Sequence, residues 1–94
     1  MSFFKSMYGG VMRDVKIIKL KADFNRNFPG EVMSGTLEGY CGTGMMVAQS
    51  LNEGAEDRLR LIEAFELGLM LEKEHHRSFA NQAYEIGVST MLDT

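Results

Sequence analysis

The segment EKEHHR, residues 72–77, gathers the side chains of this sequence best suited to chemistry. On a helix, Glu72 lies one turn before both His75 and His76, and E-x-x-H is the spacing with which helical bundles hold metal ions. A complete site would need further carboxylates from facing helices or from a second copy of the chain. The candidates for these are Glu38, Glu63 and Glu66. A metal site across a helical dimer interface is therefore one hypothesis for function.

A simpler interpretation of the same segment is a helix terminus. His75, His76 and Arg77 can all be cationic, and cations stabilise the negative carboxyl end of a helix. Histidine titrates near neutrality, so pH sensitivity would accompany this arrangement. We favour this interpretation, which predicts no cofactor and no metal, and keep Glu72, His75 and His76 as the metal candidates.

A second candidate site is a basic cluster in the front third of the chain. It consists of Lys16, Lys19, Lys21 and Arg26. If the chain is extended here, Lys19 and Lys21 point the same way and could bind phosphates of a nucleic acid or another phosphate ligand. Lysines on an exposed strand face also prevent edge-to-edge aggregation. A third possibility is docking of an acidic protein surface, including the acidic rear of this chain.

The local pattern around these lysines favours a strand. In VKIIKLKADF, residues 15–24, apolar and polar side chains alternate, which is typical of a half-buried strand. NRNFPG at 25–30 predicts a turn, and residues 31–36 are the natural partner strand. The alternative is a helix with two opposite apolar sides. One side would hold Val11, Val15, Ile18 and Ala22, and the other Ile17, Leu20 and Phe24.

From about residue 37 the apolar spacing becomes helical. A helix to about 52, the stop signal Asn-Glu-Gly at 52–54 and a helix from 55 predict an antiparallel helical hairpin. A single helix over 55–92 is too long for a compact domain, so we expect a break at HHRS, with Ser78 capping a last helix over 79–92. The predicted fold is α+β and helix-dominated: an N-terminal β-hairpin, a helical hairpin and a C-terminal helix. An all-α bundle is the alternative.

The helices of the rear half carry apolar side chains on more than one side. Helices with two apolar sides are buried on both, and the front third is too small to cover all of this surface. We therefore expect a homo-oligomer, a dimer or larger. Its predicted interface consists of Leu67, Leu71, Tyr84, Val88 and Met91.

The bulk properties limit the functional class. Ninety-four residues indicate a single domain, 1–94, with a basic N-terminal part at 1–36 and an acidic helical part at 37–94. Residues 1–30 hold six basic and two acidic groups, and residues 31–94 hold four basic and eleven acidic groups.

One cysteine, with no signal peptide or membrane-spanning run, suggests the cytoplasm and no membrane contact. We expect a small non-enzymatic binding or regulatory protein that self-associates and docks a protein partner; nucleic-acid binding is the alternative.

Overall fold

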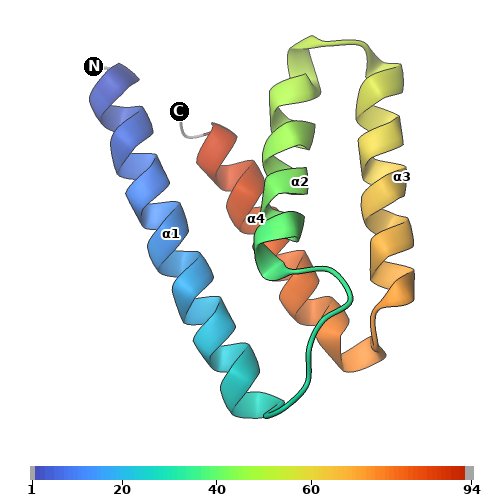
Figure 1. The fold of residues 1–94 in the computed structure, drawn as a ribbon. Coiled ribbons are helices and arrows are strands. Elements are labelled where there is room, and N and C mark those ends of the chain that lie inside the picture. Colours follow the sequence, from blue (N-terminus) through green and yellow to red (C-terminus); the bar gives the residue numbers. More distant parts are fainter. Residues whose placement is uncertain (1, 93–94) are drawn as a thin grey trace.

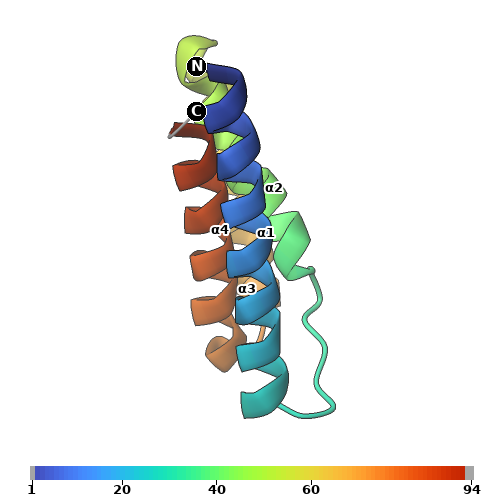
Figure 2. The same ribbon diagram turned by 90° about the vertical axis from the view of Figure 1, so that its left-hand side faces the viewer.

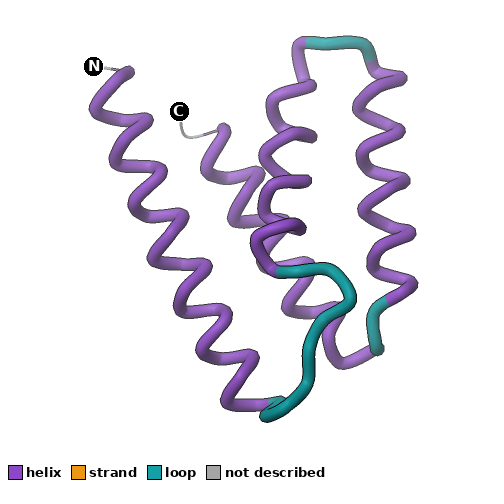
Figure 3. The backbone as a smooth tube through the Cα atoms, in the orientation of Figure 1, coloured by secondary structure: helices purple, strands orange, loops and turns teal. Residues whose placement is uncertain are grey.

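The computed structural model describes the backbone of residues 2–92 and the side chains of residues 11–51 and 53–92. Within these residues the chain forms four α-helices (Figure 1). They are α1 (Ser2–Asn27), α2 (Leu37–Gln49), α3 (Ala55–Leu71) and α4 (Arg77–Leu92). Two short 3-10 helices, η1 (Ser50–Asn52) and η2 (Glu74–His76), lie at the ends of α2 and α4. A loop over 28–36 joins α1 to α2 (Figure 3).

The predicted N-terminal β-hairpin is wrong. The described residues contain no strand, because 15–24 lies inside the 26-residue helix α1 and 31–36 is an irregular loop. The all-α bundle given as the alternative fits the structure. The helix buries Ile17, Leu20 and Phe24 on one side and leaves Val15 and Ile18 exposed on the other. Over ten residues, two apolar sides of a helix produced the alternation that resembled a strand.

The predicted turn is present but shorter than expected. The α1 helix continues to Asn27, and the turn follows at Phe28–Glu31, where the Glu31 amide donates to the Phe28 carbonyl oxygen at 3.1 Å. Pro29 cannot continue the helical hydrogen bonding, and Gly30 has a φ of 81°, which only glycine adopts readily. The turn therefore ends α1 and starts the loop toward α2.

The helical hairpin formed by α2 and α3 is confirmed. Thr36 begins α2 as its N-cap, since its side-chain oxygen accepts a hydrogen bond from the Gly39 amide at 3.0 Å. The α3 helix begins at Ala55 with Glu56 and Asp57 in its first turn, where carboxylates complement the positive pole. Figure 1 shows the two helices side by side.

The break in the rear segment lies slightly before the expected position. Helix α3 ends at Leu71 and α4 starts at Arg77, so the break falls at 72–76 and overlaps only the beginning of HHRS. The prediction that Ser78 caps the last helix is wrong, because Ser78 lies within α4 and its hydroxyl contacts Gln82 at 3.3 Å.

The centre of the fold is the crossing of α2 and α4, which also contacts α1 (Figure 1). At this crossing Gly44 and Gly87 allow the two backbones to touch. A Cβ atom placed on Gly44 would lie 2.1 Å from the Tyr84 carbonyl oxygen, and one on Gly87 would lie 1.9 Å from the Cys41 carbonyl oxygen. Glycine has a low helix propensity, but at these two positions its lack of a side chain allows the helices to pack this closely.

The whole molecule is thin, with Cα extents of 41 × 31 × 13 Å. Figure 2, which turns the view by 90°, shows this narrow profile. Helices α1 and α3 lie at opposite edges, and Phe65 is the sole buried side chain of α3. None of the helices in the described residues is long and apolar enough to cross a bilayer.

Candidate functional site

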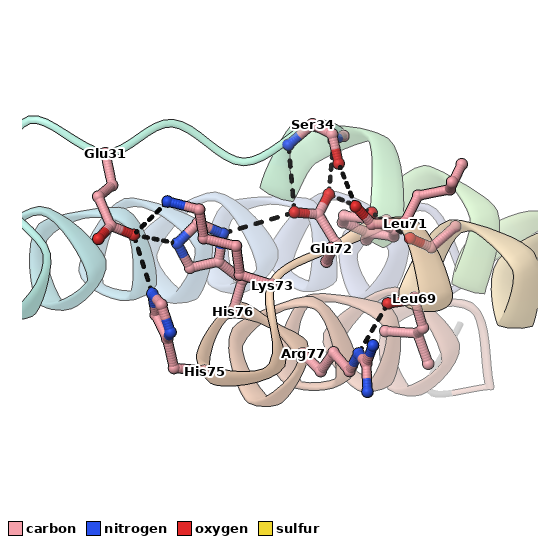
Figure 4. Close-up of polar contacts among 12 residues, drawn as sticks. Glu31, Ser34, Leu69, Leu71, Glu72, Lys73, His75, His76 and Arg77 are labelled. Atoms are coloured by element: carbon pink, nitrogen blue, oxygen red, sulfur yellow. Dashed lines mark hydrogen bonds and ion pairs between the residues drawn. The ribbon is translucent and has the colours of Figure 1, made fainter.

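The segment EKEHHR lies where α3 ends and α4 begins (Figure 4). Glu72 is the first residue after α3, and His75 and His76 belong to η2. Both histidines point toward the loop over 28–36, whose residue Glu31 meets them. The site therefore joins the α1–α2 loop to the α3–α4 junction within a single chain.

Glu31 contacts three other side chains of this site. Its Oε2 atom lies 2.9 Å from Nε2 of His75, 2.6 Å from Nε2 of His76 and 3.8 Å from Nζ of Lys73. The hydrogen bonds from His75 and then from His76 lower the pKa of Glu31 to about 2. A fully ionised carboxylate thus faces two imidazole rings.

Glu72 forms the buried end of the cluster and is only 4 % exposed. Its carboxylate accepts hydrogen bonds from the Ser34 amide at 3.1 Å, the Gly35 amide at 2.6 Å and the Tyr40 hydroxyl at 2.6 Å. Burial raises the pKa of Glu72, but the hydrogen bonds, led by the one from Tyr40, outweigh this effect and lower the pKa to about 2. Burial and then this bond raise the pKa of Tyr40. Glu72 therefore anchors the loop onto the end of α3.

His76 connects the two carboxylates and is 1 % exposed. While its Nε2 meets Glu31, its Nδ1 lies 3.5 Å from Oε2 of Glu72 and makes no hydrogen bond with any side chain that the structure describes. Its ring packs edge-on against Phe24 at a centroid distance of 4.9 Å, and His75 lies 4.5 Å from Phe28. The aromatic rings of α1 and the loop therefore contact both imidazoles, and burial among them orients the ring of His76.

Of the three residues expected to stabilise the carboxyl end of a helix, only Arg77 contacts a carbonyl group there within the described part of the chain. Arg77 donates from Nε to the Leu69 carbonyl oxygen at 3.0 Å, near the carboxyl end of α3 (Figure 4). The two histidines bind Glu31 instead of helix carbonyl groups.

The four basic residues predicted to form a cluster are dispersed. On a helix, Lys19 and Lys21 are two positions apart and lie on nearly opposite sides. Lys21 pairs with Glu38 of α2, and Arg26 pairs with Asp23. Lys16 and Lys19 are exposed and have no ion-pair partner among the side chains that the structure describes.

The predicted interface residues also divide into two groups. Leu67 and Leu71 are 58 % and 72 % exposed on α3. Tyr84 instead stacks on Phe65 at a centroid distance of 4.0 Å. Val88 and Met91 are partly buried on α4.

Two residues of the polar cluster, Glu31 and Tyr40, were not predicted. Glu31 is separated from His75 by 44 positions, and Tyr40 from Glu72 by 32, so no local spacing connects them. The available signal was that Glu31 is the single charged residue between Asn27 and Leu37. Glu38, Glu63 and Glu66, the carboxylates suggested as extra ligands, are not part of the ligand group that the structure brings together.

Seven of the twelve large apolar side chains that are exposed in the described residues form a second feature, which we call the outer faces of α1 and α3. The outer face of α1 consists of Val11, Val15 and Ile18; the outer face of α3 consists of Leu59, Leu67, Met70 and Leu71. All seven are more than half exposed. A basic residue accompanies the first face and an acidic residue the second, since Lys19 lies one turn after Val15 on α1 and Glu63 lies one turn from both Leu59 and Leu67 on α3.

Comparison of the chain with protein-family models, with curated proteins and with solved structures gives no match in any of the three.

Proposed function

We propose that this protein is a small non-enzymatic binding protein that self-associates through the outer faces of α1 and α3 and uses the same surfaces to dock a protein partner. The observation that carries the proposal is the exposure of seven large apolar side chains on two helices at opposite edges of a thin molecule. Contiguous exposed apolar surface of this kind marks interaction sites in water-soluble proteins.

The charges indicate which faces meet. Helix α1 carries six basic and two acidic residues, of which Lys21 and Arg26 already pair with carboxylates of the chain, and α3 carries two basic and four acidic residues. Pairing α1 of one copy with α3 of another brings opposite charges together, whereas pairing α1 with α1 or α3 with α3 brings like charges together. Complementarity therefore favours contact between the two different faces.

Phosphate binding by the basic residues receives less support, because Lys21 and Arg26 already pair with carboxylates of the chain. A cytoplasmic location fits the proposal, since Cys41 is a buried free thiol.

A mixing experiment tests the pairing of faces. One variant carries Val15→Glu with Ile18→Glu and damages only the outer face of α1; a second carries Leu67→Glu with Leu71→Glu and damages only that of α3. If unlike faces pair, each variant alone sediments as a monomer, and an equimolar mixture forms a complex through the two intact faces. Self-association of either variant alone to the wild-type extent, or failure of the mixture to associate, would contradict the proposal.

A further inference from the structure

Three potential metal ligands converge at the junction between the loop and η2. One carboxylate oxygen of Glu31 and the Nε2 atoms of His75 and His76 lie within 4.8 Å of one another. We propose that these three side chains form an intrachain binding site for a divalent transition-metal ion of the zinc class. This goes beyond the proposed self-association and does not depend on it.

The donor set selects the class of ion. Two imidazole nitrogens and one carboxylate oxygen suit Zn²⁺ and its neighbours in the first transition series, whereas Ca²⁺ and Mg²⁺ prefer oxygen ligands alone. Three protein ligands and one open position are typical of exchangeable or catalytic zinc sites. The open side would face solvent, because His75 and Glu31 are partly exposed while His76 is buried.

The site requires a limited rearrangement of its ligands. Tetrahedral zinc with bonds near 2.0–2.1 Å holds its ligand atoms roughly 3.3 Å apart. The two Nε2 atoms now lie 2.9 and 2.6 Å from the Glu31 oxygen, so each must move away from that oxygen by roughly half an ångström. The ligand nitrogens of His75 and His76 lie within 4.8 Å of each other and must reach the same spacing of about 3.3 Å. Glu31 and His75 have room to move outward, since neither is buried.

The geometry around the buried nitrogen of His76 fits the assignment. If Nε2 donates its proton to Glu31, a neutral ring leaves a lone pair on Nδ1, which faces the ionised Glu72 at 3.5 Å. If Nε2 instead binds a metal, the proton resides on Nδ1 and is directed at Glu72. This is the carboxylate–histidine–metal arrangement, in which the outer carboxylate fixes the ring and raises its basicity. Glu72 is itself held by three hydrogen bonds.

Lys73 is the group that opposes binding. Its ammonium lies 3.8 Å from the Glu31 oxygen and competes with a cation for that carboxylate. Its side chain is 63 % exposed, so it can turn away into solvent. We therefore expect Lys73→Ala to bind zinc more tightly than the wild type.

The test is zinc titration of the untagged, metal-free chain by calorimetry, with Co²⁺ absorption as a report on coordination. We expect one Zn²⁺ per chain at every protein concentration, and a tetrahedral Co²⁺ spectrum. His75→Asn and Glu31→Gln should each weaken binding by more than the roughly 10–100-fold cost of losing an outer-shell partner, and Glu72→Gln should weaken it by about that cost. Glu74→Gln, which changes a neighbouring exposed carboxylate, should leave binding unchanged.

His76 itself is unsuited to the test, because its replacement would disturb the buried aromatic cluster; circular dichroism confirms the fold of the other variants. Absence of saturable binding at micromolar zinc would overturn the proposal. So would binding that survives both His75→Asn and Glu31→Gln, or binding that occurs only by bridging two copies of the chain.

Discussion

The crossing of α2 and α4 and the outer edge at α3 are built in opposite ways. At the crossing, Gly44 and Gly87 bring two backbones into direct contact, and Ala80 and Ala83 are fully buried. On α3, Phe65 alone is buried, while Leu67 and Leu71 are exposed. Small residues at the crossing make a contact that the chain completes by itself. Large apolar residues at the edge make a surface that the chain leaves uncovered.

The largest expected loss of stability is at the crossing. Gly87→Ala places a methyl group 1.9 Å from the Cys41 carbonyl oxygen, so the helices must separate. We expect the free energy of unfolding to fall by about 3 kcal/mol or more, measured by urea denaturation. Gly42→Ala is the matched control: nothing lies within 4 Å of its added methyl group, and the change should stabilise α2 by up to about 1 kcal/mol. Equal effects of the two substitutions would contradict the close crossing.

Acid should weaken the junction that connects the loop to the rear helices. The pKa of Glu72 is lowered from 4.5 to about 2, so its contribution to stability is fully present above pH 4.5 and is lost as the pH falls toward 2. In metal-free buffer we expect this residue to account for roughly 3 kcal/mol of acid-induced loss. The measurement is urea denaturation across this pH range, compared with Glu72→Gln, whose acid-induced loss should be smaller. Parallel profiles for the two proteins would show that Glu72 is not responsible.

At neutral pH, Glu72→Gln should lower the free energy of unfolding by about 2 kcal/mol. The carboxylate accepts hydrogen bonds from Ser34, Gly35 and Tyr40, and the NH2 group of the glutamine would face at least one of these donors without being able to accept its hydrogen bond. Thermal or urea unfolding measures the loss. Glu74→Gln is the control, and as an exposed change it should stay within about 0.5 kcal/mol of the wild type.

The smallest effect on folding is expected on the outer face of α3. Leu67→Glu with Leu71→Glu should change the stability of the isolated chain by no more than about 0.5 kcal/mol per site, since both side chains are already exposed. The same pair should abolish self-association, measured by light scattering. Val32→Glu, on an exposed loop residue outside both outer faces, should preserve it. A large loss of stability in the α3 variant would indicate that this face is part of the core.

The sequence predicted the helical hairpin better than the front of the chain, and the reason is physical. The helical apolar spacing from about residue 37 and the Asn-Glu-Gly stop at 52–54 involve only neighbouring residues, so both are visible in the local sequence. Helix α1 was misassigned because Val15 and Ile18 are apolar without being buried, and the pattern reports hydrophobicity instead of burial.

The polar cluster was predicted only in half. The carboxylates and histidines of EKEHHR indicated a candidate site, and two of the three proposed ligands lie in this segment. The third, Glu31, is brought there by the turn at Pro29 and Gly30 and by the length of α1. Such a contact depends on the packing of whole elements, which no local spacing encodes.

Whether the outer faces of α1 and α3 bind a second copy is measured by sedimentation equilibrium of the wild-type chain from low to high micromolar concentration. We expect a weight-average mass that rises above the 10.6 kDa of one chain as concentration increases, and a smaller rise at high salt, because salt screens the charges that pair α1 with α3 but not the apolar contact. A mass of one chain at every concentration and at low salt would show that the outer faces of α1 and α3 do not bind a second copy.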